Sequence, residues 1–200
     1  IKEEPEISKN AGMTPDTMVD QLGKVMSKYE IPMGVMNKLM KLNEFEVLEF
    51  MIDDSESMAL HNSDTKGSRQ ATLSRWNEAQ QRFKELLEVL AYVPFQQIRI
   101  EFLNRSTVIS LERNGRDPAD FSSDALAQID EEFAKPPAGT SLFLEKLTKS
   151  LTESDGIKIA RWYFGDGKPQ GGDTVQEQIV NLVLNRSKPA DNPLTFVSCT

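Results

Sequence analysis

The sequence predicts an α/β protein: a doubly wound, mostly parallel sheet with one antiparallel edge strand, preceded by two short helices. First, strand-like apolar runs alternate with amphipathic helical stretches along most of the 200 residues. Second, two of the expected strands are joined only by residues 104–106, and so short a connection demands antiparallel pairing. Third, the proportions of hydrophobic (38%) and charged (27%) residues are those of a globular chain. One domain with a small appendage is expected from this length.

The first 43 residues are expected to form that appendage. Residues 1–12 are acidic and polar without periodicity, which predicts a flexible lead-in. Residues 13–43 predict a helical extension, with Thr14 and Pro15 as the cap and first turn of one helix and a break at Pro32 before a second. We expect the two helices to pack on the following domain through four apolar side chains: Leu22, Met26, Met36 and Met40.

Residues 44–200 supply the alternating pattern. Runs of apolar or alternating residues predict five strands, at 45–52, 98–102, 107–111, 157–164 and 194–199. Helical periodicity predicts four helices between them, around 76–90, 120–133, 144–151 and 175–183. Helices between parallel strands imply crossovers that cover both faces of the sheet.

Oxygen-bearing side chains gather where this topology places ligands. Asp53, Ser55 and Ser57 directly follow the first strand, Asp166 follows the fourth, and Thr140 precedes a helix. Ligands of open α/β sheets bind outside the carboxyl ends of the strands. Hard cations such as Mg²⁺ prefer oxygen ligands, and hydroxyls coordinate without adding charge. We therefore expect these five residues to converge on one rim of the sheet, with oxygen atoms of the kind that a hard cation prefers.

In this respect the sequence resembles the von Willebrand factor A (vWA) domain family over residues 44–200. The metal-ion-dependent adhesion site (MIDAS) of that family has an Asp-x-Ser-x-Ser segment after the first strand, a threonine usually within Gly-Thr, and an aspartate usually within Asp-Gly. Here the matching residues are Asp53, Ser55, Ser57, Thr140 and Asp166.

The resemblance implies a role for each of these residues. The two serines would coordinate the metal directly, and the two aspartates and the threonine directly or through water. The remaining position would accept an Asp or Glu side chain from a protein partner. Four neighbours are expected on the partner-binding rim: Glu56, His61, Gly139 and Lys168.

The sequence departs from the family pattern in three ways. Gly165 stands where a hydroxyl residue often precedes the Asp-Gly, and residues 59–74 make a long polar connection. The last strand and helix of the family do not follow residues 194–199, so a conformational switch based on that helix is not carried over.

Two other functions stay open. A Mg²⁺-dependent enzyme that hydrolyses phosphoryl groups would need a second carboxylate two positions after Asp53, where Ser55 stands, and a catalytic lysine, for which Lys168 is the candidate. A vWA scaffold without metal is the third hypothesis. No nucleophile and base stand together in sequence, so a binding module without catalysis is preferred.

The net charge and the cysteine content limit which classes of binding partner and which cellular compartment are expected. The formal net charge of −8 argues against nucleic-acid binding, which needs clustered Lys and Arg. No apolar run approaches a membrane span. The single cysteine, Cys199, excludes an intrachain disulfide and favours a cytoplasmic location. Because the sequence begins at Ile1, we expect that the natural N-terminus, with any targeting signal, precedes it.

Overall fold

A five-stranded mixed sheet forms the centre of the computed structural model, which describes residues 14–61, 73–153, 156–166 and 172–198. The strand order is β3-β2-β1-β4-β5. All neighbours pair in parallel except β2 and β3, which are antiparallel. The predicted mostly parallel sheet with one antiparallel edge strand is therefore confirmed. The strands are β1 (Val47–Ile52), β2 (Gln97–Phe102), β3 (Val108–Glu112), β4 (Ile159–Gly165) and β5 (Leu194–Ser198).

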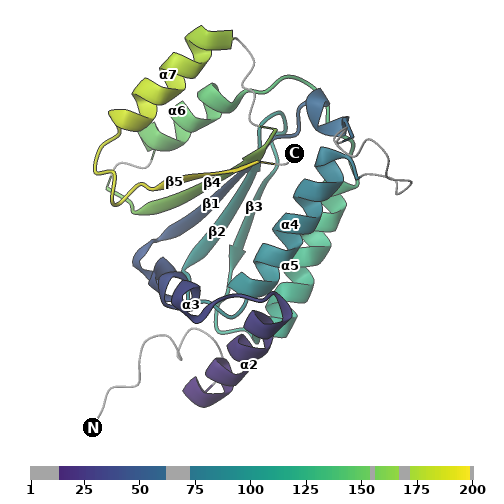
Figure 1. Ribbon diagram of the computed structural model, residues 1–200, viewed down its shortest axis with the longest axis vertical. Coiled ribbons are helices and arrows are strands. Elements are labelled where there is room, and N and C mark those ends of the chain that lie inside the picture. Colours follow the sequence, from purple (N-terminus) through teal and green to yellow (C-terminus); the bar gives the residue numbers. More distant parts are fainter. Residues whose placement is uncertain (1–13, 62–72, 154–155, 167–171, 199–200) are drawn as a thin grey trace.

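Helices cover both faces of this sheet, as the doubly wound prediction requires (Figure 1). Helices α4 and α5 lie on one side, and α6 and α7 lie on the other. Among the described residues, no helix combines the length and apolar character that a membrane crossing requires. The helices are α2 (Pro15–Lys28), α3 (Met33–Leu39), α4 (Arg75–Leu90), α5 (Pro118–Phe133), α6 (Phe143–Glu153) and α7 (Gly172–Leu184), with 3₁₀ turns η1 (Met40–Glu44) and η2 (Glu56–Ala59).

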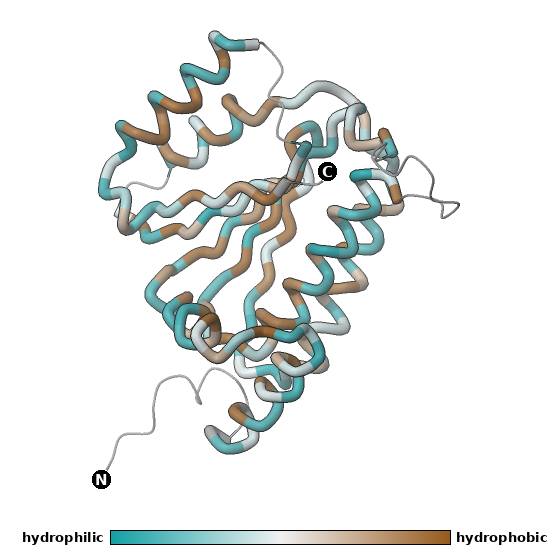
Figure 2. Tube along the Cα trace, viewed as in Figure 1, coloured by the Kyte–Doolittle hydropathy of each residue, from teal (hydrophilic) through white to brown (hydrophobic). Residues whose placement is uncertain are grey.

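The main hydrophobic core lies between the sheet and helices α4 and α5. Aromatic rings join the layers: the centroid of Phe83 lies 5.1 Å from that of Phe50 and 5.6 Å from that of Phe164. All six residues of β1 are buried. Five of the six residues of β1 are apolar, whereas the helices alternate hydrophobic and hydrophilic residues (Figure 2). This contrast follows from strands buried on two faces and helices buried on one.

The opposite face of the sheet carries a smaller core under α6 and α7. Phe143, Leu147 and Ile179 pack there against Met51 and Tyr163. Because successive strand residues point to opposite faces, alternate residues of β1 and β4 serve this second core. The face also holds buried charged residues, which lie between the strands and α6.

The N-terminal helices belong to the main core. Helix α2 begins as expected, with the Thr14 hydroxyl accepting the Thr17 N–H at 3.3 Å and a proline in the first turn. Leu22 and Met26 are 2% and 5% exposed and join the buried cluster around α4. At the end of the helix, Tyr29 donates a hydrogen bond to Glu88 of α4. Met36 and Met40 are partly buried against the same cluster.

Candidate metal site

The candidate site begins where β1 ends. Asp53 is fully buried, and its N–H donates to the carbonyl of Phe164 at 2.8 Å, so β1 and β4 stay paired to this point. The Asp53 Oδ1 atom then accepts the N–H of Ser55 at 2.9 Å. Such a bond two residues along the chain is typical of aspartate turns. It ends the strand and holds the backbone of Ser55 beside the Asp53 carboxylate.

Ser55 and Ser57 lie side by side at the start of η2. Their Oγ atoms are 3.1 Å apart. The next residue, Met58, is fully buried in the main core and so fixes the turn to the domain. Adjacent ligands of an octahedral Mg²⁺ ion at its usual bond length are about 2.9 Å apart. The spacing of the two hydroxyls therefore fits neighbouring corners of one magnesium coordination shell.

The second oxygen of Asp53 is held by groups from two other segments. Its Oδ2 atom accepts the hydroxyl of Tyr163 at 2.7 Å and that of Ser141 at 3.2 Å. Burial raises the pKa of Tyr163, and the nearby charge of Asp53 raises it further, so the tyrosine stays protonated and donates. A carboxylate has about four lone-pair positions. The three hydrogen bonds orient Asp53 and leave Oδ1 able to accept one more partner.

Asp166 reaches the same edge from the end of β4. Its side chain is 5% exposed, and Oδ2 forms an ion pair with Nη1 of Arg75 at 3.2 Å. The same Nη1 approaches the carbonyl of Ser57 at 3.5 Å, which places Asp166 beside the serine turn. Across the described ranges, no group of three or more His, Cys, Asp or Glu side chains could hold a metal ion. A cation at this edge would therefore depend on hydroxyl ligands.

Residues 138–140 are the third segment at the site, after the turn that follows β1 and the end of β4. Gly139 has a φ of +91°, and its carbonyl accepts the N–H of Glu56 at 3.1 Å. A Cβ atom at position 139 would lie 2.6 Å from Oδ1 of Asn104, so only glycine fits. Thr140 follows directly and is exposed, next to the Ser141 hydroxyl that binds Asp53. Thr140 is thus an exposed residue between two neighbours that contact the site.

Asp54 ties these loops together. One of its carboxylate oxygens accepts both the backbone and side-chain N–H groups of Asn104, at 2.8 and 3.0 Å. The other pairs with Arg105 at 3.2 Å. The backbone carbonyl of Asp54 accepts the N–H of Ala138 at 2.7 Å. Asp54 is 1% exposed, so this anchor holds the loop after β2 and the segment before α6 against the serine turn.

The structure also gives a physical reason for Gly165. A Cβ atom at this position would lie 2.3 Å from the Tyr163 hydroxyl. In this protein the hydroxyl that reaches Asp53 comes from Tyr163, two residues earlier on the same strand. The absence of a side chain at position 165 therefore leaves room for the Tyr163 hydroxyl.

We expect Gly165→Ala to destabilise the fold by about 1–3 kcal/mol, because the added methyl overpacks a closed site. Tyr163 cannot easily yield, since its ring packs 4.2 Å from that of Phe143. Urea denaturation measures the effect. The matched control is Gly23→Ala in α2, where an added Cβ meets nothing within 4 Å, and helix propensity predicts stabilisation of up to about 1 kcal/mol. Equal responses of the two variants would contradict this explanation of Gly165.

The other expected rim residues are less tightly placed. Glu56 and His61 are exposed, and His61 forms an isolated bridge with Ser74 before α4. Lys168, like Cys199, lies outside the described residues. Three residues that contact the site were not expected: Arg75, Ser141 and Tyr163. For Ser141, the only sequence signal of a role at the site was its hydroxyl next to Thr140. In the sequence, Arg75 looks only like the start of a helix, and Tyr163 looks only like an aromatic residue of the core.

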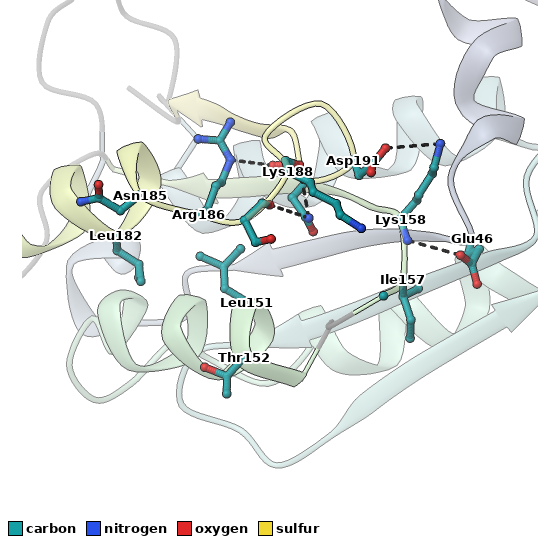
Figure 3. Close-up of a pocket in the computed structure, with 13 residues that line it drawn as sticks. Glu46, Leu151, Thr152, Ile157, Lys158, Leu182, Asn185, Arg186, Lys188 and Asp191 are labelled. Atoms are coloured by element: carbon teal, nitrogen blue, oxygen red, sulfur yellow. Dashed lines mark hydrogen bonds and ion pairs between the residues drawn. The ribbon is translucent and has the colours of Figure 1, made fainter.

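A cavity of about 550 Å³ opens at the opposite edge of the sheet, near the beginnings of β1 and β4 (Figure 3). Its charges are largely compensated within the chain. Lys158 pairs with Asp191 at 3.3 Å, and its N–H donates to Glu46. The guanidinium of Arg186 donates to two backbone carbonyls. This cavity shares no residue with the candidate metal site at the end of β1, so the cavity and the site are separate features.

No protein-family model matches the sequence, and a search of curated proteins finds no significant match.

Proposed function

We propose that the protein is a vWA-type binding module that holds Mg²⁺ or Mn²⁺ at the end of β1 and captures a carboxylate of a protein partner through that ion. Asp53, Ser55, Ser57 and Asp166 would hold the cation, with Thr140 as a further ligand directly or through water. The bound cation supplies positive charge and an open coordination position. The chain itself supplies a rigid oxygen set and no catalytic step.

One observation carries the proposal: the turn after β1 holds two serine hydroxyls 3.1 Å apart, close to the buried Asp53 and to Asp166, whose side chain is 5% exposed. Buried polar groups normally satisfy one another or a ligand. The hydroxyls and carboxylates are hard oxygen donors, which suits Mg²⁺ or Mn²⁺ better than softer metals. The fold supports the same proposal, because the edge lies at the carboxyl ends of paired parallel strands.

The charge of the ligand set supports a carboxylate partner. Two aspartates balance the two charges of the cation, and neutral hydroxyls add none, so an incoming Asp or Glu is not repelled by an excess of negative ligands. The net charge of −8 opposes an acidic partner at long range. The attraction is therefore local, and the complex depends on the cation more than on ionic strength.

We expect Asp53→Asn to weaken Mn²⁺ binding by at least about a hundredfold, because loss of even an outer partner of a metal ligand commonly costs 10–100-fold. The asparagine keeps the size and an acceptor oxygen for the Ser55 N–H, and the hydroxyl of Tyr163 can accept from its amide, so the fold should survive. Isothermal titration of chelator-treated protein with Mn²⁺ and Mg²⁺ measures the affinity. Wild-type binding is expected to be weak, since magnesium gives up water reluctantly.

Glu56→Gln is the matched control, because it removes one negative charge from an exposed side chain of the same turn. Its metal affinity should stay near that of the wild type. Ser57→Ala, which removes one hydroxyl and no charge, should also lose affinity. Wild-type affinity in Asp53→Asn and Ser57→Ala would show that the cation does not bind at this edge.

A further inference from the structure

The side chain of Arg75 places a positive charge at the candidate metal site, where it pairs with Asp166. It is the first residue of α4, directly after the Ser74 cap, whose hydroxyl accepts the N–H of Asn77 at 3.2 Å. The N–H of Arg75 donates to the carbonyl of Leu60 at 3.0 Å. The backbone at this point is therefore fixed, and the side chain reaches from the start of α4 to the end of β4.

The guanidinium of Arg75 is poorly satisfied in this position. It meets Asp166 through one nitrogen, at 3.2 Å, whereas arginine and carboxylate commonly pair through two parallel hydrogen bonds. The Nε atom is buried and has no hydrogen-bond partner among the described residues. By contrast, Arg105 binds Asp54 through Nε and three backbone carbonyls through its other nitrogens. A buried donor without a partner is uncommon and calls for an explanation.

We propose that Arg75 competes with the divalent cation for Asp166, so that breaking the Arg75–Asp166 ion pair sets the metal affinity of the site. This inference rests on the proposed metal site. The guanidinium touches Asp166 and the carbonyl of Ser57, two of the residues that the cation would approach. A dication bound there repels the guanidinium at short range, where Coulomb forces are strong. Metal binding therefore releases Arg75 from Asp166, and metal loss restores the pair.

The same competition gives Arg75 a role in the metal-free protein. Asp53 accepts the hydroxyl of Tyr163 on β4, and Asp166 directly follows that strand, so both carboxylates lie at the same end of the sheet. Two nearby carboxylates without a cation would repel each other. Arg75 supplies one positive charge that offsets this repulsion. The arginine thus stabilises the metal-free protein and, for the same reason, opposes the cation.

The first test is calorimetric titration of Mn²⁺ into chelator-treated wild-type protein, Arg75→Gln and Arg75→Lys. We expect Arg75→Gln to bind Mn²⁺ about tenfold more tightly, the low end of the effect of a neighbouring opposite charge on the proton affinity of a carboxylate. Arg75→Lys, which keeps the charge, should stay closer to the wild type. Arg82→Gln makes the same change in net charge on an exposed side chain of α4 and should leave the affinity unchanged.

The second test compares thermal unfolding in chelator and in saturating Mn²⁺. If the ion pair exists only in the metal-free protein, Arg75→Gln destabilises that form and has a smaller effect on the loaded form. Linkage requires the difference between the two effects to match the change in metal affinity. A purely structural arginine would destabilise both forms equally. If Arg75→Gln does not fold, Arg75→Met, which keeps an unbranched apolar stem, makes the same comparison.

The outcomes separate the two proposals. Equal affinity in the wild type and Arg75→Gln overturns the competition and leaves the metal site intact. Binding by Arg75→Gln alone, with none by the wild type, supports competition in its strongest form. Failure of both proteins to bind Mn²⁺ or Mg²⁺ overturns the metal site and the competition together.

Discussion

Glu49→Ala is expected to destabilise the protein by about 3–5 kcal/mol, the usual cost of removing one partner of a buried ion pair. Glu49 is 1% exposed, in the middle of β1. Its Oε2 atom pairs with Nε of Arg161 on β4 at 3.0 Å, and the side chain of Arg161 is fully buried. Removal of the carboxylate leaves this guanidinium without its counter-charge inside the fold. Urea denaturation, followed by tryptophan fluorescence, measures the loss.

The geometry explains why the effect should be large. In the strand register Glu49 lies opposite Arg161 on one side and Arg99 on the other, so three charges form one row across the sheet. Arg161 also donates to the hydroxyl and carbonyl of Ser150 on α6 and to Asn192. Burial lowers the pKa of Arg161, and the Glu49 carboxylate opposes that shift. The row thereby links the sheet to α6 through polar contacts on a face with a small hydrophobic core.

A double substitution tests the origin of the loss. Glu49→Leu with Arg161→Met removes both buried charges, and such exchanges are often neutral or stabilising. We expect the double variant to be more stable than Glu49→Ala. Glu101→Gln is the control, because its carboxylate is partly exposed and pairs with Arg99 at 3.5 Å; its effect should stay below about 1 kcal/mol. The single variants Glu49→Leu and Arg161→Met are measured as well. If the double variant loses as much free energy of unfolding as the two single variants together, packing and not charge dominates.

The fold could be predicted from the sequence because hydrophobic periodicity dominates in both kinds of element. The apolar run before Asp53 and the stripe from Trp76 to Leu90 correspond to β1 and α4, with ends that differ by one or two residues. The length of the 104–106 connection was enough to require the antiparallel edge pair. The charged row was beyond prediction, because Glu49 and Arg161 are 112 residues apart and only the strand order makes them neighbours.

The candidate site was predictable to the extent that its residues directly follow strands. The placement of Asp53 and Asp166 at strand ends follows from topology, and a turn after Asp53 does bring Ser55 to Ser57. Whether these residues bind a metal stays a prediction. Arg75 and Tyr163 could not be foreseen, since their side chains reach the site from a helix start and a buried strand. Long side chains act at a distance from their backbone, which spacing in sequence does not reveal.

The N-terminal helices give the second large effect: Leu22→Ala is expected to lower the free energy of unfolding by about 2–5 kcal/mol. Leu22 is 2% exposed and lies in the same buried cluster as the core side chains of α4. Truncation removes apolar contacts and leaves a cavity that a close-packed core fills only in part. The loss should appear in the main unfolding transition, because the helix and the sheet share one core.

Val19→Ala is the matched control, since Val19 lies one turn away on the same helix and is 62% exposed. Its effect should stay within about 0.5 kcal/mol. Deletion of residues 1–42 should lower the melting temperature further and increase the binding of a hydrophobic dye, because it uncovers the surface that Leu22 and Met26 now cover. If Leu22→Ala and the deletion both leave the main transition unchanged, the helices unfold separately from the sheet. They would then be an arm held on the domain mainly by polar contacts such as those of Lys28 and Tyr29 with Glu88.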